Sequence, residues 1–179
     1  MKIPNRVSIH ERPIIVTKRT EYGHCEGDSV LYKNKMAINT INELMTGKVR
    51  FTKLDRKTAE ATKDALISGV HEMGAKSYTL DNGTEFMDHE TVTAKTGVPV
   101  FFADTYCSNQ RGSNENTNML LRGYLPKRTD ITNLTQEELN DIAQELNNRP
   151  RKRLGYMTPN EYYKYFVQGD SKVALDCRM

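Results

Sequence analysis

The sequence predicts a mixed α/β fold, in which a three-stranded antiparallel meander precedes alternating helices and strands. Three strand-like runs, separated by the short breaks KN and MTG, cover residues 23–32, 35–44 and 48–54. After them apolar residues recur at helical spacing, and the last third of the chain looks helical. A hairpin-built sheet followed by alternating elements is typical of α+β and mixed α/β proteins.

The alternating part contains two helices and two strands. Apolar residues at helical spacing predict a helix over 59–73, which a glycine at the next position ends. The segment KSYTL (76–80) predicts a fourth strand, and VPVFFA (98–103) a fifth. Between them, residues 87–97 predict a short helix that also ends at a glycine.

Three further helices are predicted in the last third, over residues 113–125, 134–148 and 158–166. The second has the clearest start, because Thr135 and Glu138 have the spacing of a capping box. The third repeats this device, with proline at its first helical position.

The remaining segments suggest one domain with appendages, in keeping with a length of 179 residues. Residues 1–22 are polar, contain two prolines and show no period, so we expect a linker or extended arm. We place the core domain at 23–168 and a C-terminal tail at 169–179. No apolar run approaches the roughly 18 residues that span a membrane, and the N-terminus has no signal-peptide pattern. We therefore expect no membrane partner and a cytoplasmic protein with reduced thiols.

Composition gives only weak functional information. The net charge of +3, from 26 Lys and Arg against 23 Asp and Glu, is weak evidence for an anionic partner. The three cysteines lie far apart without a CxxC motif, which argues against a zinc finger or a disulfide framework. The four histidines are scattered as well.

Three acidic residues stand out by their positions in the predicted elements. Asp28 lies within the first strand, Asp81 directly follows the fourth strand in the motif DNG, and Glu115 lies in the first turn of a helix. If the first and fourth strands are neighbours, Asp28 and Asp81 converge, and the helix adds Glu115. Three carboxylates without Cys or His favour Mg²⁺ or Mn²⁺.

Two such ions about 3.5–4 Å apart can stabilise both the attacking and the leaving oxygen of a phosphoryl transfer. Each acid also has an ordinary alternative. The DNG motif alone is more often a turn, a helical glutamate usually faces solvent, and a strand aspartate can pair with a lysine. Spacing alone leaves both interpretations open.

Several longer motifs resemble the catalytic half of insertion-sequence-thirty (IS-thirty) type transposases. These belong to the retroviral-integrase and transposase group of the ribonuclease-H-like fold. The similarity runs from about residue 3 to residue 166, and it is carried by the motifs IPNRVSIHERP, GHCEGDSV, LDNGTEF, RGSNENTNMLLRGYLPKRTD and LNNRPRKRLGYMTPNEYY. The resemblance implies a retroviral integrase core fold: a mixed five-stranded sheet, three antiparallel strands then two parallel, flanked by helices.

The resemblance also implies the site. The family's three metal-binding acids match Asp28, Asp81 and Glu115 of this sequence. Asn118 matches a polar position next to the metals, and we expect it to hold a carboxylate. Arg122, on the same helical face, is expected to contact a phosphate.

The implied reaction is DNA strand cleavage and strand transfer by a Mg²⁺-dependent (or Mn²⁺-dependent) DDE transposase, with two ions when DNA is bound. The implied partners are transposon-end and target DNA and a second copy of the chain or a larger oligomer, without a nucleotide cofactor. The implied location is the nucleoid of a bacterial cytoplasm. The residues expected to hold the DNA backbone are Lys127, Arg128, Arg149, Arg151, Lys152 and Arg153. For the last four, a solvated helix end is the alternative.

Two features set this chain apart from the family pattern. The family's N-terminal helix-turn-helix region, which reads the transposon ends, is expected to be absent. The loop 103–112 and Met119 are altered, and this loop is expected to control how Glu115 reaches the metals. Two alternatives therefore stay open: a catalytically weakened or inactive transposase-derived domain that binds DNA or self-associates, and a stand-alone metal nuclease of the same fold.

Overall fold

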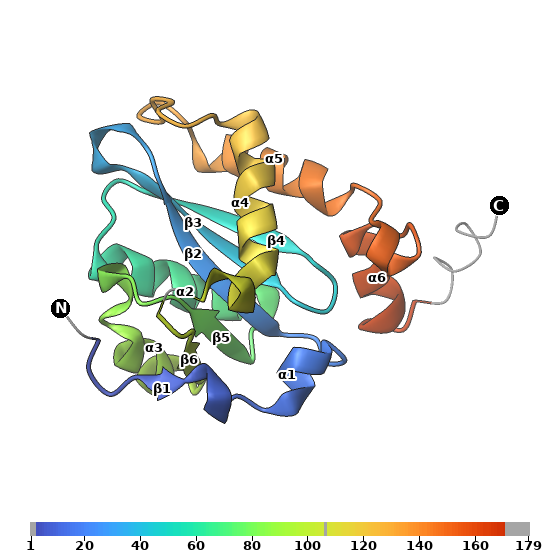
Figure 1. Ribbon diagram of the computed structural model, residues 1–179. Coiled ribbons are helices and arrows are strands. Elements are labelled where there is room, and N and C mark those ends of the chain that lie inside the picture. The colour runs from blue at the N-terminus through green and yellow to red at the C-terminus, as the bar shows by residue number, and fades with distance from the viewer. Residues whose placement is uncertain (1–2, 106, 171–179) are drawn as a thin grey trace.

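The computed structural model describes residues 3–105 and 107–170, and within these ranges it contains one mixed sheet of six strands (Figure 1). Strands β2, β3 and β4 pair antiparallel, as predicted, whereas β2, β5, β6 and β1 run parallel. The strand order is β1-β6-β5-β2-β3-β4. The bounds are β1 (Val7–Ser8), β2 (His24–Leu31), β3 (Ala37–Glu43), β4 (Val49–Leu54), β5 (Ser77–Leu80) and β6 (Val100–Phe102).

The prediction of five strands is wrong, because the segment 1–22 contributes β1 to the sheet edge. Val7 pairs with Phe101 and Ser8 with Phe102, both in parallel register with β6. A two-residue strand is too short to show a period of two, so the sequence carries no pattern for it. The expected linker or arm thus contains β1 and the short helix α1. Of the predicted tail 169–179, residues 171–179 lie outside the described residues.

The α-helices of the described chain match the predicted ones closely, apart from α1. Thr135 and Thr158 each form the predicted capping box, with Glu138 and Glu161 respectively. None of these helices is long and apolar enough to cross a membrane. The bounds are α1 (Ile14–Lys18), α2 (Ala59–Met73), α3 (His89–Thr96), α4 (Gly112–Tyr124), α5 (Gln136–Asn147) and α6 (Pro159–Phe166).

Helices cover both faces of the sheet, and each face has its own apolar core (Figure 1). Leu66 of α2 packs with Cys25 and Tyr78 on one face. Leu121 of α4 packs with Val30 and residues of α5 on the other. Because side chains alternate along a strand, the residues of β2 at positions 26, 28 and 30 all point toward α4.

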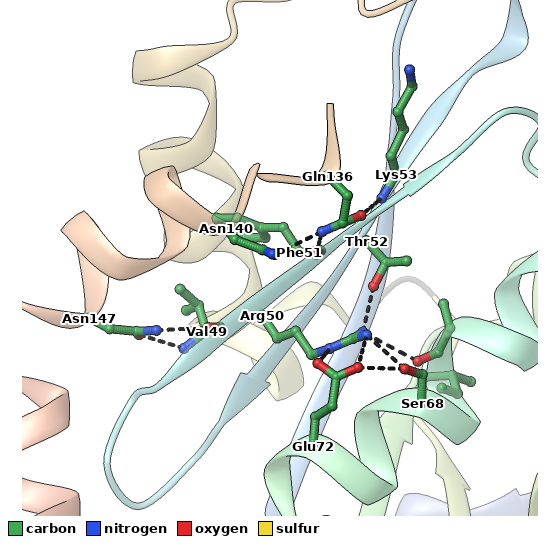
Figure 2. Close-up of polar contacts among 12 residues, drawn as sticks. Val49, Arg50, Phe51, Thr52, Lys53, Ser68, Glu72, Gln136, Asn140 and Asn147 are labelled. Atoms are coloured by element: carbon green, nitrogen blue, oxygen red, sulfur yellow. Dashed lines mark hydrogen bonds and ion pairs between the residues drawn. The ribbon is translucent and has the colours of Figure 1, made fainter. Parts of the chain in front are cut away.

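The outer edge of β4 is closed by side chains of α5 (Figure 2). Asn147 accepts a hydrogen bond from Val49 N (2.8 Å) and donates one to Val49 O (2.9 Å). Further along β4, Gln136 accepts a hydrogen bond from Lys53 N (3.0 Å) and donates one to Phe51 O (2.8 Å). These amides replace a neighbouring strand, so the edge is not open to pairing with another chain.

On the sheet face that α2 covers, β4 is joined to this helix by an ion pair with two hydrogen bonds (Figure 2). Arg50 donates from Nε to Glu72 Oε2 (2.7 Å) and from Nη2 to Glu72 Oε1 (2.8 Å). This two-point geometry fixes both planar groups. The Arg50 hydrogen bond holds the pKa of the Glu72 carboxyl below its usual value.

Candidate active site

The first two predicted acids lie at equivalent positions of adjacent parallel strands. In the β2–β5 pair Glu26 lies opposite Thr79, and continuing this register by two residues places Asp81 opposite Asp28. Both then lie on the sheet face that α4 covers. The first and fourth predicted strands, β2 and β5, are neighbours in the sheet, so the condition for Asp28 and Asp81 to converge is met.

Gly27 lets the two strands carry their acids side by side. A Cβ atom at Gly27 would lie 2.7 Å from Leu80 Cδ2, closer than van der Waals contact allows. The buried Leu80 side chain therefore occupies the space that any larger residue at position 27 would need.

Asp28 is held by the partner that the sequence predicted. Asn118 of α4 donates from Nδ2 to Asp28 Oδ2 (2.7 Å). The other amide atom, Asn118 Oδ1, accepts from Thr40 Oγ1 (3.0 Å), which fixes the orientation of the amide. The second carboxylate oxygen, Asp28 Oδ1, accepts from Ser29 N (2.8 Å).

Asp81 forms a turn and an ion pair. Its Oδ1 accepts from Gly83 N (2.8 Å), which is the local bond expected of an aspartate that starts a turn. Its Oδ2 accepts from Arg111 Nη2 (3.2 Å). The same guanidinium donates from Nη1 to Gly27 O (3.1 Å), next to Asp28 in the chain. Arg111 therefore links the ends of β2 and β5.

Arg111 reaches this position from the loop 103–112. Asp104 N donates to Gln110 Oε1 and Gln110 Nε2 donates back to Asp104 Oδ2, both at 2.8 Å. These two hydrogen bonds close the loop on itself and position Arg111 near the carboxyl end of β5, just before α4 begins. This loop is thus the element that places the Arg111 guanidinium on Asp81.

Glu115, in the first turn of α4, lines the same cavity as Asp28. The cavity has a volume of about 690 Å³ and is also lined by Arg122 and Met119. Met119, whose apolar character would favour a place in the core, has an exposed fraction of 64%. Met119 instead forms part of the cavity wall, which Asn118 and Arg111 complete.

The donor chemistry of the three acids fits a hard cation, but their arrangement does not yet enclose one. As the described residues lie here, no three or more Asp, Glu, His or Cys side chains are grouped closely enough to hold a metal ion. Asp28 and Glu115 share a cavity, whereas Asp81 is paired with Arg111. Arg111 supplies to Asp81 the positive charge that a bound cation would otherwise supply.

The predicted basic residues separate into two groups. Lys127 and Arg128 lie exposed in the turn after α4, at the end of the helix opposite to Glu115. Arg149, Lys152 and Arg153 are also exposed, and Arg151 is partly buried. Of these four, Arg151 and Arg153 line a cavity near the acids.

Sequence reasoning missed Glu26, a further acid below α4. Glu26 is 2% exposed, and its Oε2 accepts from Asn114 N (3.1 Å) in the first turn of α4. Burial raises the pKa of this carboxyl, while the bond from Asn114 N lowers it. The carboxylate anchors the N-terminus of α4. The only available signal was its spacing of two residues from Asp28, which places both on one face of a strand.

Fold and site together define a mixed α/β protein with one acid within β2, one directly after the adjacent parallel strand β5, and one on the helix above them. No family model matches the chain. Curated relatives do match it, and they are transposases of insertion sequence elements. The transposase for IS4351 of Bacteroides fragilis is 41% identical over 94% of this chain and 53% of its own length.

Two further relatives agree with this. The transposase for IS1086 of Cupriavidus metallidurans is 41% identical over 88% of this chain and 48% of its own length. Transposase InsI for IS30A of Escherichia coli K12 is 40% identical over 90% of this chain and 43% of its own length. The resemblance to IS30-family transposases is thereby confirmed. The chain spans about half the length of the curated relatives it matches.

Proposed function

We propose that the chain is the catalytic part of a transposase and carries out metal-dependent DNA strand cleavage and strand transfer. The observation that carries this proposal is the placement of Asp28 within β2 and of Asp81 directly after the adjacent strand β5, beneath α4, where Glu115 shares the cavity of Asp28. The similarity to IS30-family transposases supports the same class of reaction. A ribonuclease-H-like fold is part of this proposal, and the mixed sheet with helices on both faces is consistent with it.

In this proposal Asp28, Asp81 and Glu115 hold Mg²⁺ or Mn²⁺ once Arg111 has left Asp81. When bound, the ions supply charge stabilisation for the attacking and leaving oxygens. Asn118 keeps the Asp28 carboxylate oriented toward the cavity through its bond of 2.7 Å. Arg122, on the cavity wall, neutralises a phosphate of the bound strand.

The proposed reaction has two phosphoryl transfers. A water molecule first displaces the 3′-oxygen of one DNA phosphodiester, which leaves a 5′-phosphate and a free 3′-hydroxyl. This 3′-hydroxyl then attacks a phosphodiester of the target strand and displaces the 3′-oxygen there. Because the second step forms one phosphodiester as it breaks another, no nucleotide cofactor is required. The expected partners are transposon-end DNA, target DNA and a second copy of the chain.

A second candidate is a DNA-binding or self-associating domain without catalysis. The Arg111–Asp81 ion pair favours it, since this contact neutralises one of the three acids. The two candidates make opposite predictions for strand cleavage and the same prediction for DNA binding.

The deciding experiment incubates the chain with a nicked or branched duplex and Mg²⁺ or Mn²⁺. Asp81→Asn is the test variant and Asp88→Asn, close by at the start of α3, is the matched control. We expect metal-dependent cleavage or joining by the wild type and the control, and at most residual activity in Asp81→Asn. Equal products from wild type and Asp81→Asn, or none from either, would reject catalysis by this site.

A further inference from the structure

A second cavity lies beside the acids and gathers arginines from distant parts of the chain. Its volume is about 350 Å³. Arg19 comes from the end of α1, while Arg151 and Arg153 come from the turn η5 (Lys152–Leu154) and the residue before it. The two cavities share Gly112 and Asn116 as lining residues, so the first turns of α4 separate them.

The structure holds two of these guanidinium groups at one point above the β3–β4 turn. Arg153 donates from Nη1 to Met45 O (3.1 Å), and Arg151 donates from Nη2 to Leu146 O at a long 3.4 Å. Gly47 between them has φ +75°; a Cβ atom there would overlap Arg153 Nη2 and lie 3.6 Å from Arg151 Nη1. Glycine therefore leaves the space in which the two groups converge.

No acid neutralises this cluster. The cavity wall contains no Asp or Glu, and within the described chain none of the three arginines forms an ion pair. The carboxylates whose charges act on these arginines are those of Glu26, on Arg19, and Glu43, on Arg153. Both acids are buried.

One carboxylate oxygen of Glu26 and both of Glu43 already have hydrogen-bond donors. Glu26 accepts from Asn114 N, and the Glu43 oxygens accept from backbone N–H groups of residues 23, 45 and 46 and from a threonine hydroxyl. Partial burial and the neighbouring guanidinium groups lower the pKa of Arg151 and of Arg153, while Glu43 raises that of Arg153, which agrees with cations gathered at one point. An anion in the cavity would relieve that repulsion.

The opposite wall offers neutral donors. Ser113 Oγ accepts from Arg19 Nη2 (2.8 Å), which positions Arg19 at the first turn of α4. Asn116 and Thr117 add an amide and a hydroxyl to the wall. The N-terminus of the 13-residue helix α4 adds a partial positive charge. Three guanidinium groups with neutral donors match a phosphodiester, which offers acceptor oxygens and one negative charge.

We propose that Arg19, Arg151 and Arg153 bind one backbone phosphodiester of DNA, in the cavity next to the one that Asp28 and Glu115 line. The inference rests on the proposed function only in taking DNA as the ligand. Since Gly112 and Asn116 line both cavities, a strand held at the arginines passes along the first turns of α4 to Asp28 and Glu115. Arg19 thus gives the segment before β2 a direct contact with DNA, although no sequence pattern marked this residue.

The test measures binding of the chain to a fluorescent duplex by anisotropy, in EDTA and over a series of KCl concentrations. The variants are Arg19→Gln, Arg153→Gln and the double variant. The controls are Lys18→Gln, next to Arg19, and Lys95→Gln on α3, which covers the other sheet face. Thermal unfolding of each variant verifies that it is folded, and Arg19 is exposed and makes no core contact.

Each arginine variant should make the slope of log K against log [KCl] less negative by about one unit, while the controls keep the wild-type slope. The slope of the double variant should change by no more than that of either single variant, because both residues contact the same phosphate. Slopes equal to those of the controls would overturn the proposal, and so would a loss of about two units in the double variant.

The outcome is independent of catalysis because no metal is present. Asp81→Asn should bind DNA with the wild-type slope. Wild-type slopes in the arginine variants, together with Asp81-dependent cleavage, would reject the cavity and leave the proposed function standing. Less negative slopes in the arginine variants, without cleavage by the wild type or any variant, would support the cavity and reject the proposed function.

Discussion

The carboxylate of Asp81 has one local and one distant partner, and together they define its present state. Gly83 N binds one oxygen and Arg111 the other. The DNG motif allowed either a turn or a metal ligand. The structure shows the turn, while the role as a ligand stays a prediction. What the motif did not contain was Arg111, which arrives from thirty residues further along the chain.

Arg111→Gln should strengthen Mn²⁺ binding, because it removes the cation that competes for Asp81. Arg111 is 13% exposed and Asp81 35% exposed in their side chains. A pair of this partial exposure corresponds to an effect of about two- to five-fold in affinity. Calorimetric titration of Mn²⁺ into wild type and variant measures it. Weaker binding by the variant would mean that Arg111 orients Asp81 for the metal instead of competing with it.

Asn118→Ala should weaken Mn²⁺ binding by about 10- to 100-fold, the usual effect of losing a hydrogen bond to a metal-binding carboxylate. The physical reason is that Asp28 Oδ2 loses its donor at 2.7 Å and can rotate. Asn140→Ala, an exposed asparagine on α5, is the control. Equal affinities in both variants would show that Asn118 serves only the packing of α4.

The sequence was informative about this site wherever a residue's role followed from its own element. Asp28, Asp81 and Asn118 lie on predicted elements, and the neighbouring strands bring the two aspartates together. Arg111 and Glu26 were missed because their roles depend on tertiary contacts, with the end of β5 and with the first turn of α4. No local period or motif carries such information.

At the scale of single elements, the helices were predicted best because their ends are marked in the chain. The capping boxes at Thr135 and Thr158 fixed the starts of α5 and α6. Glycines fixed the ends of α2 and α3, where Gly74 and Gly97 adopt positive φ. The strand β1 has no such marks, since its two residues exist as a strand only through pairing with β6.

Helix α5 should stabilise the fold mainly by closing the edge of β4. Asn147→Ala would leave both Val49 N and Val49 O buried without a partner (Figure 2). We expect a loss of about 1–3 kcal/mol in the free energy of unfolding, measured by urea denaturation.

Asn140→Ala on the exposed face of the same helix should change this free energy far less. If Asn147→Ala were as stable as Asn140→Ala, the amide would not be a structural substitute for a strand.

Across the whole molecule, residues 3–22 are joined to the sheet at several points. Arg12 donates from Nη1 to Thr79 Oγ1 (2.9 Å) on β5. His89 Nε2 lies 3.1 Å from Pro4 O, and the His89 ring contacts Phe102 with centroids 4.9 Å apart. This segment therefore belongs to the folded unit in structural terms, and it brings Arg19 to the first turn of α4.

The buried His89 should make the fold less stable in mild acid. Burial lowers its pKa, with Glu90 and Asp88 opposing the shift. Below about pH 6.5, the usual histidine pKa, the unfolded chain then binds a proton more readily than the folded one. Stability should fall as pH decreases from there through the lowered pKa.

Urea denaturation between pH 7.5 and pH 5 should show a smaller loss of stability for His89→Gln than for the wild type. Comparison of the two proteins removes the contribution of other titrating groups. An identical pH dependence would mean that His89 does not contribute through its protonation.

The central claim is that Asp28, Asp81 and Glu115 form one cation site between β2, β5 and α4, and titration with Mn²⁺ tests it most directly. Calorimetry or the spin resonance of free Mn²⁺ gives the affinity without any need for DNA or catalysis. We expect Asp28→Asn to weaken binding by at least about ten-fold and Asp88→Asn, on the start of α3, to leave it unchanged. Unchanged Mn²⁺ binding by Asp28→Asn would contradict the account.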